Sequence, residues 1–318
     1  MPQFRPYQYH SPADKSQAVS NAVSATLAAQ PTGKLSDRAM LIDLTISAYA
    51  GSKKDPKVAA EIARQHGSAE RMGSYTKLLL PAEALAPITQ LANAIRTYHR
   101  THTLPWLDSG SRILASAAYF DYTQQMRTFK VQWDDATTTF VNAYPAMRGQ
   151  AKVLLNGLFD PNDYPDPNRI GEKFNLAYTV YPFPDSQDFR LNLSADATAA
   201  LRAQLEQSVN AAVQQATMDI VKRMRDVVGK MAERLSAYKV TKDGVENRFH
   251  DTLVSNIGDL ITLVPILNIT GDPNITKLAM EMTDLIQYHP QQLRDDDVLR
   301  KDTAERADAI LKAMEDFV

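Results

Sequence analysis

Hydrophobic and polar residues alternate with period two early in the chain, across residues 38–48. The residues on one side are Ile42, Leu44, Ile46 and Ala48, and those on the other are Asp43, Thr45 and Ser47. A period of two predicts a half-buried β-strand. Gly51 and the polar run that follows it are expected to end this strand.

A second alternating pattern lies near the middle of the chain. Its two arms carry Leu176, Tyr178 and Val180, and Phe189, Leu191 and Leu193. The sequence between the arms, PFPDSQD, is rich in turn-forming residues. The pattern predicts a small antiparallel hairpin, and its prolines favour the edge of a sheet.

A helical period replaces the alternation from about Ser194 to Lys239. The apolar stripe of this segment is Leu201, Leu205, Val209, Ala212, Ala216, Ile220, Met224, Val227, Met231, Leu235 and Tyr238. The mean step of about 3.7 residues is typical of a nearly straight helix. At 1.5 Å per residue such a helix is roughly 65–70 Å long.

Helical spacing also dominates most of the remaining chain. The segments are 57–65, a helix starting at Pro81, an aromatic-rich helix that Pro145 should kink or end, 146–159, 245–263, 274–288 and 297–317. The predicted fold is mainly α (α+β): an elongated helical body with long central helices and a small antiparallel sheet. We predict a flexible N-terminal tail over 1–33, a helical core with sheet and long helix over 34–240, and a C-terminal helical region over 241–318 packed on that core.

Composition narrows the class of protein. Hydrophobic residues make up 44% of the 318 residues, the net charge is −2, and there is no cysteine. Disulfides, thiol catalysis and Cys-ligated zinc are therefore excluded. The most apolar segment, 253–269, is short and contains Asn256, Asp259 and Pro265, so we expect a buried helix and no membrane association. A cytoplasmic location in a bacterial host cell is the corresponding expectation.

Two patterns have the residue types of a metal site. His99 and His102 are three residues apart, but an isolated pair lacks a third ligand, so helix-end histidines explain them better. The loop DPNDYPDPN over 160–168 is acidic but lacks the glycine and glutamate of an EF-hand, so its Asp and Asn residues indicate turns. We predict no metal, no cofactor and no catalytic site.

The long helix carries a row of basic residues. These are Lys222, Arg223, Arg225 and Lys230, and Arg5 lies in an aromatic stretch of the N-terminal tail. Such a row could follow the phosphates of a nucleic acid. Acidic residues are interleaved, however, and the i,i+4 pairs Asp219–Arg223 and Asp226–Lys230 would neutralise much of the row. A solvated helix face is the favoured interpretation, with nucleic-acid binding as the alternative.

The order of several segments resembles that of a protein family. These are the Gly-Ser-Lys-Lys turn at 51–54, GSYTKLLLPAEALAPI at 73–88, Tyr164-Pro165, and YTVYPFP at 178–184 before DFRLNL. Over residues 35–240 the pattern resembles a bacteriophage and prophage family of unknown function, often encoded near MoxR-type AAA+ ATPases and von Willebrand factor A proteins. The resemblance implies a phage origin and an ATPase as a candidate partner, and it supplies no active-site residues.

The sequence therefore predicts a phage protein that is not an enzyme and acts by protein–protein interaction. Its expected role is that of a self-associating or adaptor component, with a homo-oligomer as the expected state and an AAA+ ATPase as a candidate partner. The alternative is a single-stranded nucleic-acid-binding protein of phage DNA replication or protection.

Overall fold

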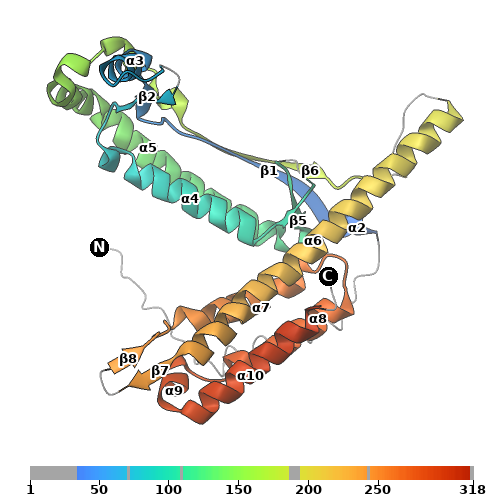
Figure 1. The fold of residues 1–318 in the computed structure, drawn as a ribbon. Coiled ribbons are helices and arrows are strands. Elements are labelled where there is room, and N and C mark those ends of the chain that lie inside the picture. Colours follow the sequence, from blue (N-terminus) through green and yellow to red (C-terminus); the bar gives the residue numbers. More distant parts are fainter. Residues whose placement is uncertain (1–33, 70–71, 108–109, 186–193, 242–243, 316–318) are drawn as a thin grey trace, which may run out of the picture. The chain divides into compact units, whose positions relative to one another are not determined.

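The fold was analysed in a computed structural model that describes residues 34–69, 72–107, 110–185, 194–241 and 244–315. Long α-helices dominate these residues, and the strands form small antiparallel pairs and one four-stranded sheet (Figure 1). The predicted class, mainly α with a small antiparallel sheet, is confirmed.

The described chain forms two compact units. Unit 1 contains 34–42, 102–119 and the described part of 180–318, and unit 2 contains 43–101 and 120–179, again without the gaps. Strands β1 and β6 each begin in one unit and end in the other. The segment 34–240, predicted as a single core, therefore contributes to both units.

Unit 1 is built on the longest helix. Its complete elements are α2 (Leu35–Arg38), β4 (Leu104–Pro105), β5 (Arg112–Ala115), α6 (Ala195–Ala237), β7 (Lys239–Thr241), β8 (Gly244–Glu246), α7 (Thr252–Leu267), α8 (Pro273–Thr283), α9 (Pro290–Asp295) and α10 (Asp297–Ala313). Ser194 caps α6, because its side chain accepts a hydrogen bond from the Ala197 N–H. Helix α6 packs against α7 and α10 through Met224, Val228 and other fully buried residues.

Unit 2 is built on a pair of helices. Its complete elements are β2 (Ser52–Lys54), α3 (Pro56–Gln65), β3 (Thr76–Leu78), α4 (Ala86–Thr101) and four short turns of 3₁₀ helix at Ala82–Ala84, Asn156–Leu158, Pro161–Asp163 and Ile170–Lys173. Helix α5 (Tyr119–Leu155) lies in unit 2 except for its first residue. Helices α4 and α5 lie side by side (Figure 1), and the His99 ring nitrogen Nδ1 is 2.7 Å from the Tyr122 hydroxyl. The aromatic stripe predicted for α5 is the core here, since Tyr122, Trp133, Phe140 and Tyr144 are buried.

The four-stranded sheet has the order β4-β5-β1-β6, where β1 is Ala39–Ser47 and β6 is Asn175–Pro182. Strands β1 and β5 are antiparallel and pair Ala39 with Ala115 and Ile42 with Arg112. The predicted strands at 38–48 and at the first arm of the hairpin are thus present. The second arm, with Phe189, Leu191 and Leu193, lies outside the described residues.

Several local predictions were wrong. Of the two outcomes predicted for Pro145, a kink or an end of the helix, the end does not occur, because α5 continues to Leu155. Phe140 and Tyr144, in the turn before the proline, are buried in the core, and their packing offsets the lost backbone hydrogen bond. The polar run after Gly51 forms β2, residues 104–105 form β4, and residues 245–251 precede α7 instead of starting it. Short strands escape pattern analysis because two or three residues show no period.

Gly51 lies between β1, which ends at Ser47, and β2, and its backbone and surroundings yield a first prediction. Its φ of +63° lies in the left-handed region, and a Cβ at this position would be 2.6 Å from Leu85 Cδ1. We expect Gly51→Ala to lower the free energy of unfolding by about 2 kcal/mol. Gly67→Ala is the control, because Gly67 has a φ of +64° with nothing near the added carbon. Urea unfolding measures the loss of stability in both variants, and the difference between the two losses is the effect of the clash with Leu85. Equal losses in the two variants would contradict the prediction.

Candidate functional site

The first part of α6, residues 195–211, is a helical surface without buried side chains. The buried residues of α6 begin at Ala212, although its apolar stripe starts at Leu201. Leu201, Leu205 and Val209 are half-buried and, at i and i+4 spacing, share one side of the helix. We call these three residues the α6 ridge.

The α6 ridge is unusual because an isolated helix segment of this kind has little stability of its own. A short helical segment is marginal in water unless an apolar face packs on something. From Ala212 onward α6 has such packing, against α7 and α10, whereas residues 195–211 contribute no fully buried side chain to unit 1. A sequence that maintains leucines and valine along such a face is typical of a helix that packs on a partner.

A second apolar surface lies at the C-terminal end of α5, in unit 2. Val153 is 80% exposed and Leu154 is 73% exposed, and Leu158 follows in the next turn, also exposed. We call these residues the α5 tip. Asn156, with a φ of +43°, ends the helix at this point. Adjacent large apolar side chains with such exposure are typical of interaction surfaces.

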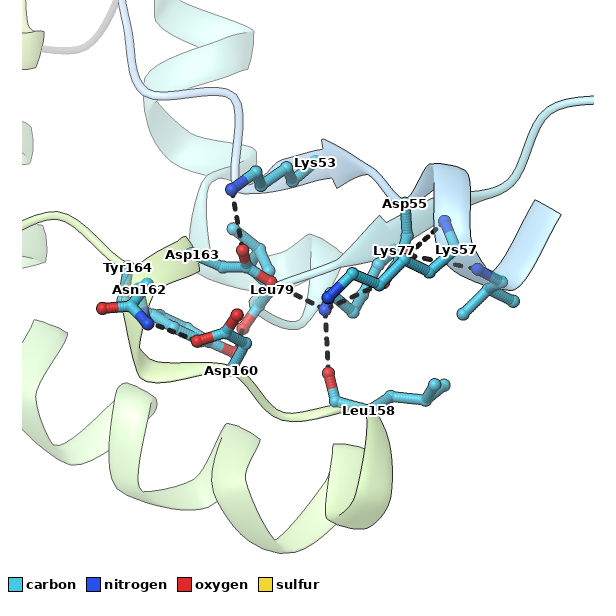
Figure 2. A network of polar contacts seen from close by, with 11 residues as sticks. Lys53, Asp55, Lys57, Lys77, Leu79, Leu158, Asp160, Asn162, Asp163 and Tyr164 are labelled. Carbon is cyan, nitrogen blue, oxygen red and sulfur yellow. Dashed lines mark hydrogen bonds and ion pairs between the residues drawn. The ribbon is translucent and has the colours of Figure 1, made fainter. Parts of the chain in front are cut away.

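A buried ion cluster holds the backbone of the α5 tip. Lys77, only 4% exposed, places its Nζ 2.6 Å from Asp163 Oδ2 and 3.2 Å from Asp55 Oδ2, and it donates to the Leu158 carbonyl at 2.8 Å (Figure 2). An ammonium group has three N–H donors, and each has an acceptor here. Lys53 pairs with the other oxygen of Asp163 at 2.8 Å. We call these four side chains the Lys77 cluster.

The electrostatics of the Lys77 cluster are those of a fixed ion pair. The hydrogen bond to Asp163 raises the pKa of Lys77 despite the burial of its ammonium group. Lys53 first, and then Lys77, lowers the pKa of Asp163, while the Val58 N–H is the largest cause of the lowered pKa of Asp55. Lys77 thus holds its proton at neutral pH, which suits a structural cation and not a nucleophilic amine.

The acidic loop 160–168 works as a connector between elements of unit 2. Tyr164 donates its hydroxyl to the Leu79 carbonyl at 2.9 Å, and Asp163 belongs to the Lys77 cluster. Asp160 and Asp166 accept from backbone N–H groups two residues ahead, as turn residues do. Within the part of the chain that the structure describes, no three His, Cys, Asp or Glu side chains gather in the manner of a metal site.

The basic row on α6 does not form a uniform cationic surface. Arg223 donates to the Thr103 carbonyl and pairs with Asp219 at 2.7 Å, and Arg225 donates to the Met314 carbonyl. These two arginines tie α6 to neighbouring parts of unit 1, while Lys222 and Lys230 are exposed. The predicted pair Asp219–Arg223 is confirmed. Arg5 lies outside the described residues, and nucleic-acid binding stays a prediction.

No family model, curated protein or solved structure matches the chain in the comparisons with known proteins. The resemblance to a phage family therefore stays a prediction as well. None of the helices in the described part of the chain is both long and apolar enough to cross a lipid bilayer.

Sequence reasoning missed the Lys77 cluster completely. The signal was weak but present: in β3 the lysine is buried between the exposed neighbours Thr76 and Leu78, the reverse of the usual alternation. A lysine in an apolar strand pattern indicates a buried ion pair only when its partners are known. Those partners come from segments more than 20 and more than 80 residues away in the chain.

Proposed function

We propose that the protein acts by protein–protein interaction, as a self-associating component whose α6 ridge packs on a second copy of the chain. The observation that carries this proposal is the start of buried residues at Ala212, well after the apolar stripe begins at Leu201. Packing two such ridges together would bury Leu201, Leu205 and Val209, whose burial contributes about 25 cal/mol per Å² of apolar surface removed from water.

The test is the mass of the protein in solution. We expect wild-type protein at tens of micromolar to elute as a multiple of the 35.4 kDa chain in size-exclusion chromatography with light scattering. Leu205→Glu should shift the protein to the monomer, because a carboxylate placed between two ridges loses its hydration.

Gln204→Glu is the matched control for this variant. It adds the same charge at the neighbouring, exposed position and should leave the mass unchanged. Circular dichroism of both variants checks that the helices are intact. A wild-type protein that is strictly monomeric would refute self-association.

An AAA+ ATPase is the alternative occupant of the ridge, and it comes from the sequence resemblance alone. In that case a monomeric wild-type chain would bind a purified MoxR-type AAA+ ATPase, and Leu205→Glu would abolish that binding while Gln204→Glu would not. The adaptor and the self-associating forms of the proposal are thus separated by two measurements on the same variants.

A further inference from the structure

Unit 2 contains a cavity of about 280 Å³ that no part of the proposed function uses. One wall is α5, with Trp133 and Lys130, and the opposite wall is formed by Gly171, Phe174 and the first residues of β6. Phe174 is held in place by Phe140, whose ring centroid is 5.3 Å away. The volume is close to the lower end of the range for small-molecule sites, so it suits a ligand of a few heavy atoms up to amino-acid size.

The most informative residue of the cavity is Trp133, which is 1% exposed. Its indole N–H donates no hydrogen bond to any of the described residues, although buried indole N–H groups usually have a partner. The indole nitrogen is also not one of the completely enclosed polar atoms that lack partners. The small accessible part of Trp133 therefore includes this donor, and Trp133 is one of the residues that line the cavity.

The rim determines which charge the ligand can carry. Lys130 and Asp134 lie one helical turn apart at the cavity and neutralise each other, with Nζ 2.5 Å from Oδ1. Thr138 and Asn175 add a hydroxyl and a carboxamide, both on exposed residues. Because the two charges cancel, the rim offers neither a carboxylate nor a cation a net counter-charge that would offset the hydration lost on binding.

We propose that this cavity binds a neutral carbonyl-bearing group, a carboxamide in particular, whose oxygen accepts the hydrogen bond of the Trp133 indole. The N–H groups of the same carboxamide would lie next to Thr138 and Asn175, the polar residues of the rim. The ligand is either a free small amide or an amide side chain of another protein segment, since both present the same chemistry. The site is independent of the α6 ridge.

The indole proton of Trp133 reports binding directly by NMR. The chain has two tryptophans, so Trp106→Phe assigns the two indole signals in a ¹H–¹⁵N spectrum. Titration with acetamide should move the Trp133 signal downfield and saturate, with half-saturation on the order of millimolar for so small a ligand. Acetate, the charged analogue, should move it at least about tenfold less at equal concentration.

Gly171→Val tests the location of the site. Gly171 lines the cavity, and its added carbon would meet only Val141 at 3.9 Å, an ordinary contact, so the fold should be retained while the cavity is narrowed. We expect acetamide binding to weaken at least about tenfold. Gly149→Val is the control, on an exposed part of α5 with nothing near the added carbon.

The source of the ligand is distinguished by a second titration, with a short capped peptide that contains glutamine and with the same peptide containing glutamate. Tighter binding of the glutamine peptide than of acetamide indicates a protein segment, and the reverse indicates a free amide. An unsaturable shift, an equal shift in Gly171→Val, or a preference for acetate would overturn the proposal.

Discussion

Replacing Lys77 by methionine should lower the free energy of unfolding by about 3 kcal/mol. The substitution keeps the length of the side chain but leaves Asp163, which is itself nearly buried, without its closest cation. It also leaves the Leu158 carbonyl without its donor. The loss should be at the low end for a broken buried pair, because Lys53 stays beside Asp163.

Urea unfolding followed by tryptophan fluorescence measures this effect. Trp133 lies in unit 2 with the Lys77 cluster and Trp106 lies in unit 1, so a Trp106→Phe background reports on unit 2 alone. Lys54→Met is the matched control, since Lys54 is exposed on the neighbouring strand, and it should change stability by less than about 0.5 kcal/mol. Equal effects of the two substitutions would show that the cluster is dispensable.

The pH dependence gives the same prediction an independent check. Asp163 and Asp55 have lowered pKa values in the folded protein, so their contribution to stability is complete above the unfolded value of about 3.9 and is lost as the pH falls through the folded values. The raised pKa of Lys77 acts in the opposite direction, and its contribution is lost at alkaline pH. Wild-type protein and Lys77→Met should therefore begin to converge in stability only below about pH 4, as the pH falls toward the lowered folded pKa values.

Replacing Arg300 by methionine should cost about 2–3 kcal/mol in unit 1. Arg300 is 5% exposed, donates to the buried Leu293 carbonyl at 3.1 Å, and stacks its guanidinium 4.6 Å from the centre of the Tyr238 ring. It thereby joins the start of α10 to the end of α9 and to the residue after α6. Methionine fills the space but leaves the carbonyl without a donor.

Two further variants sharpen this result. Arg300 and its exposed neighbour Lys301 both pair with Asp297. Lys301→Met removes only the exposed cation and should cost less than about 0.5 kcal/mol. Arg300→Lys should be intermediate, because an ammonium can donate to the carbonyl but stacks less well on the ring. Fluorescence of Trp106 in a Trp133→Phe background follows unit 1. A loss for Arg300→Lys as large as that for Arg300→Met would assign the effect to the planar guanidinium alone.

The elements whose apolar pattern repeats over many residues were predictable from the sequence. Helix α6 was placed within a residue or two at both ends, because its stripe repeats over many turns and Ser194 supplies a cap. Strand β1 was found because Ile42, Leu44 and Ile46 alternate with polar residues over enough positions to exclude a helix. The aromatic core of α5 followed from the same kind of repetition.

Candidate sites were far less predictable. The basic row on α6 was visible in the sequence, but only the structure assigns Arg223 and Arg225 to backbone carbonyls of distant segments. The cavity beside Trp133 depends on how Gly171 and Phe174 are placed against α5, which no local pattern encodes. His99 and His102 were interpreted as helix-end histidines, and only the structure shows that His99 is buried and contacts the Tyr122 hydroxyl.

The sequence by itself determined the helices, the strand β1, and the apolar stripe of α6, which begins several turns before the buried part of that helix. These features were visible because a helix or strand that is buried on one side has a periodic pattern of apolar residues. Only the tertiary structure decided that α5 passes through Pro145, that Lys77 is enclosed by two carboxylates, and that the chain divides into two units by crossing between them. The physical reason is that these features depend on contacts between residues far apart in the chain, whose energies override the local preferences that a sequence displays.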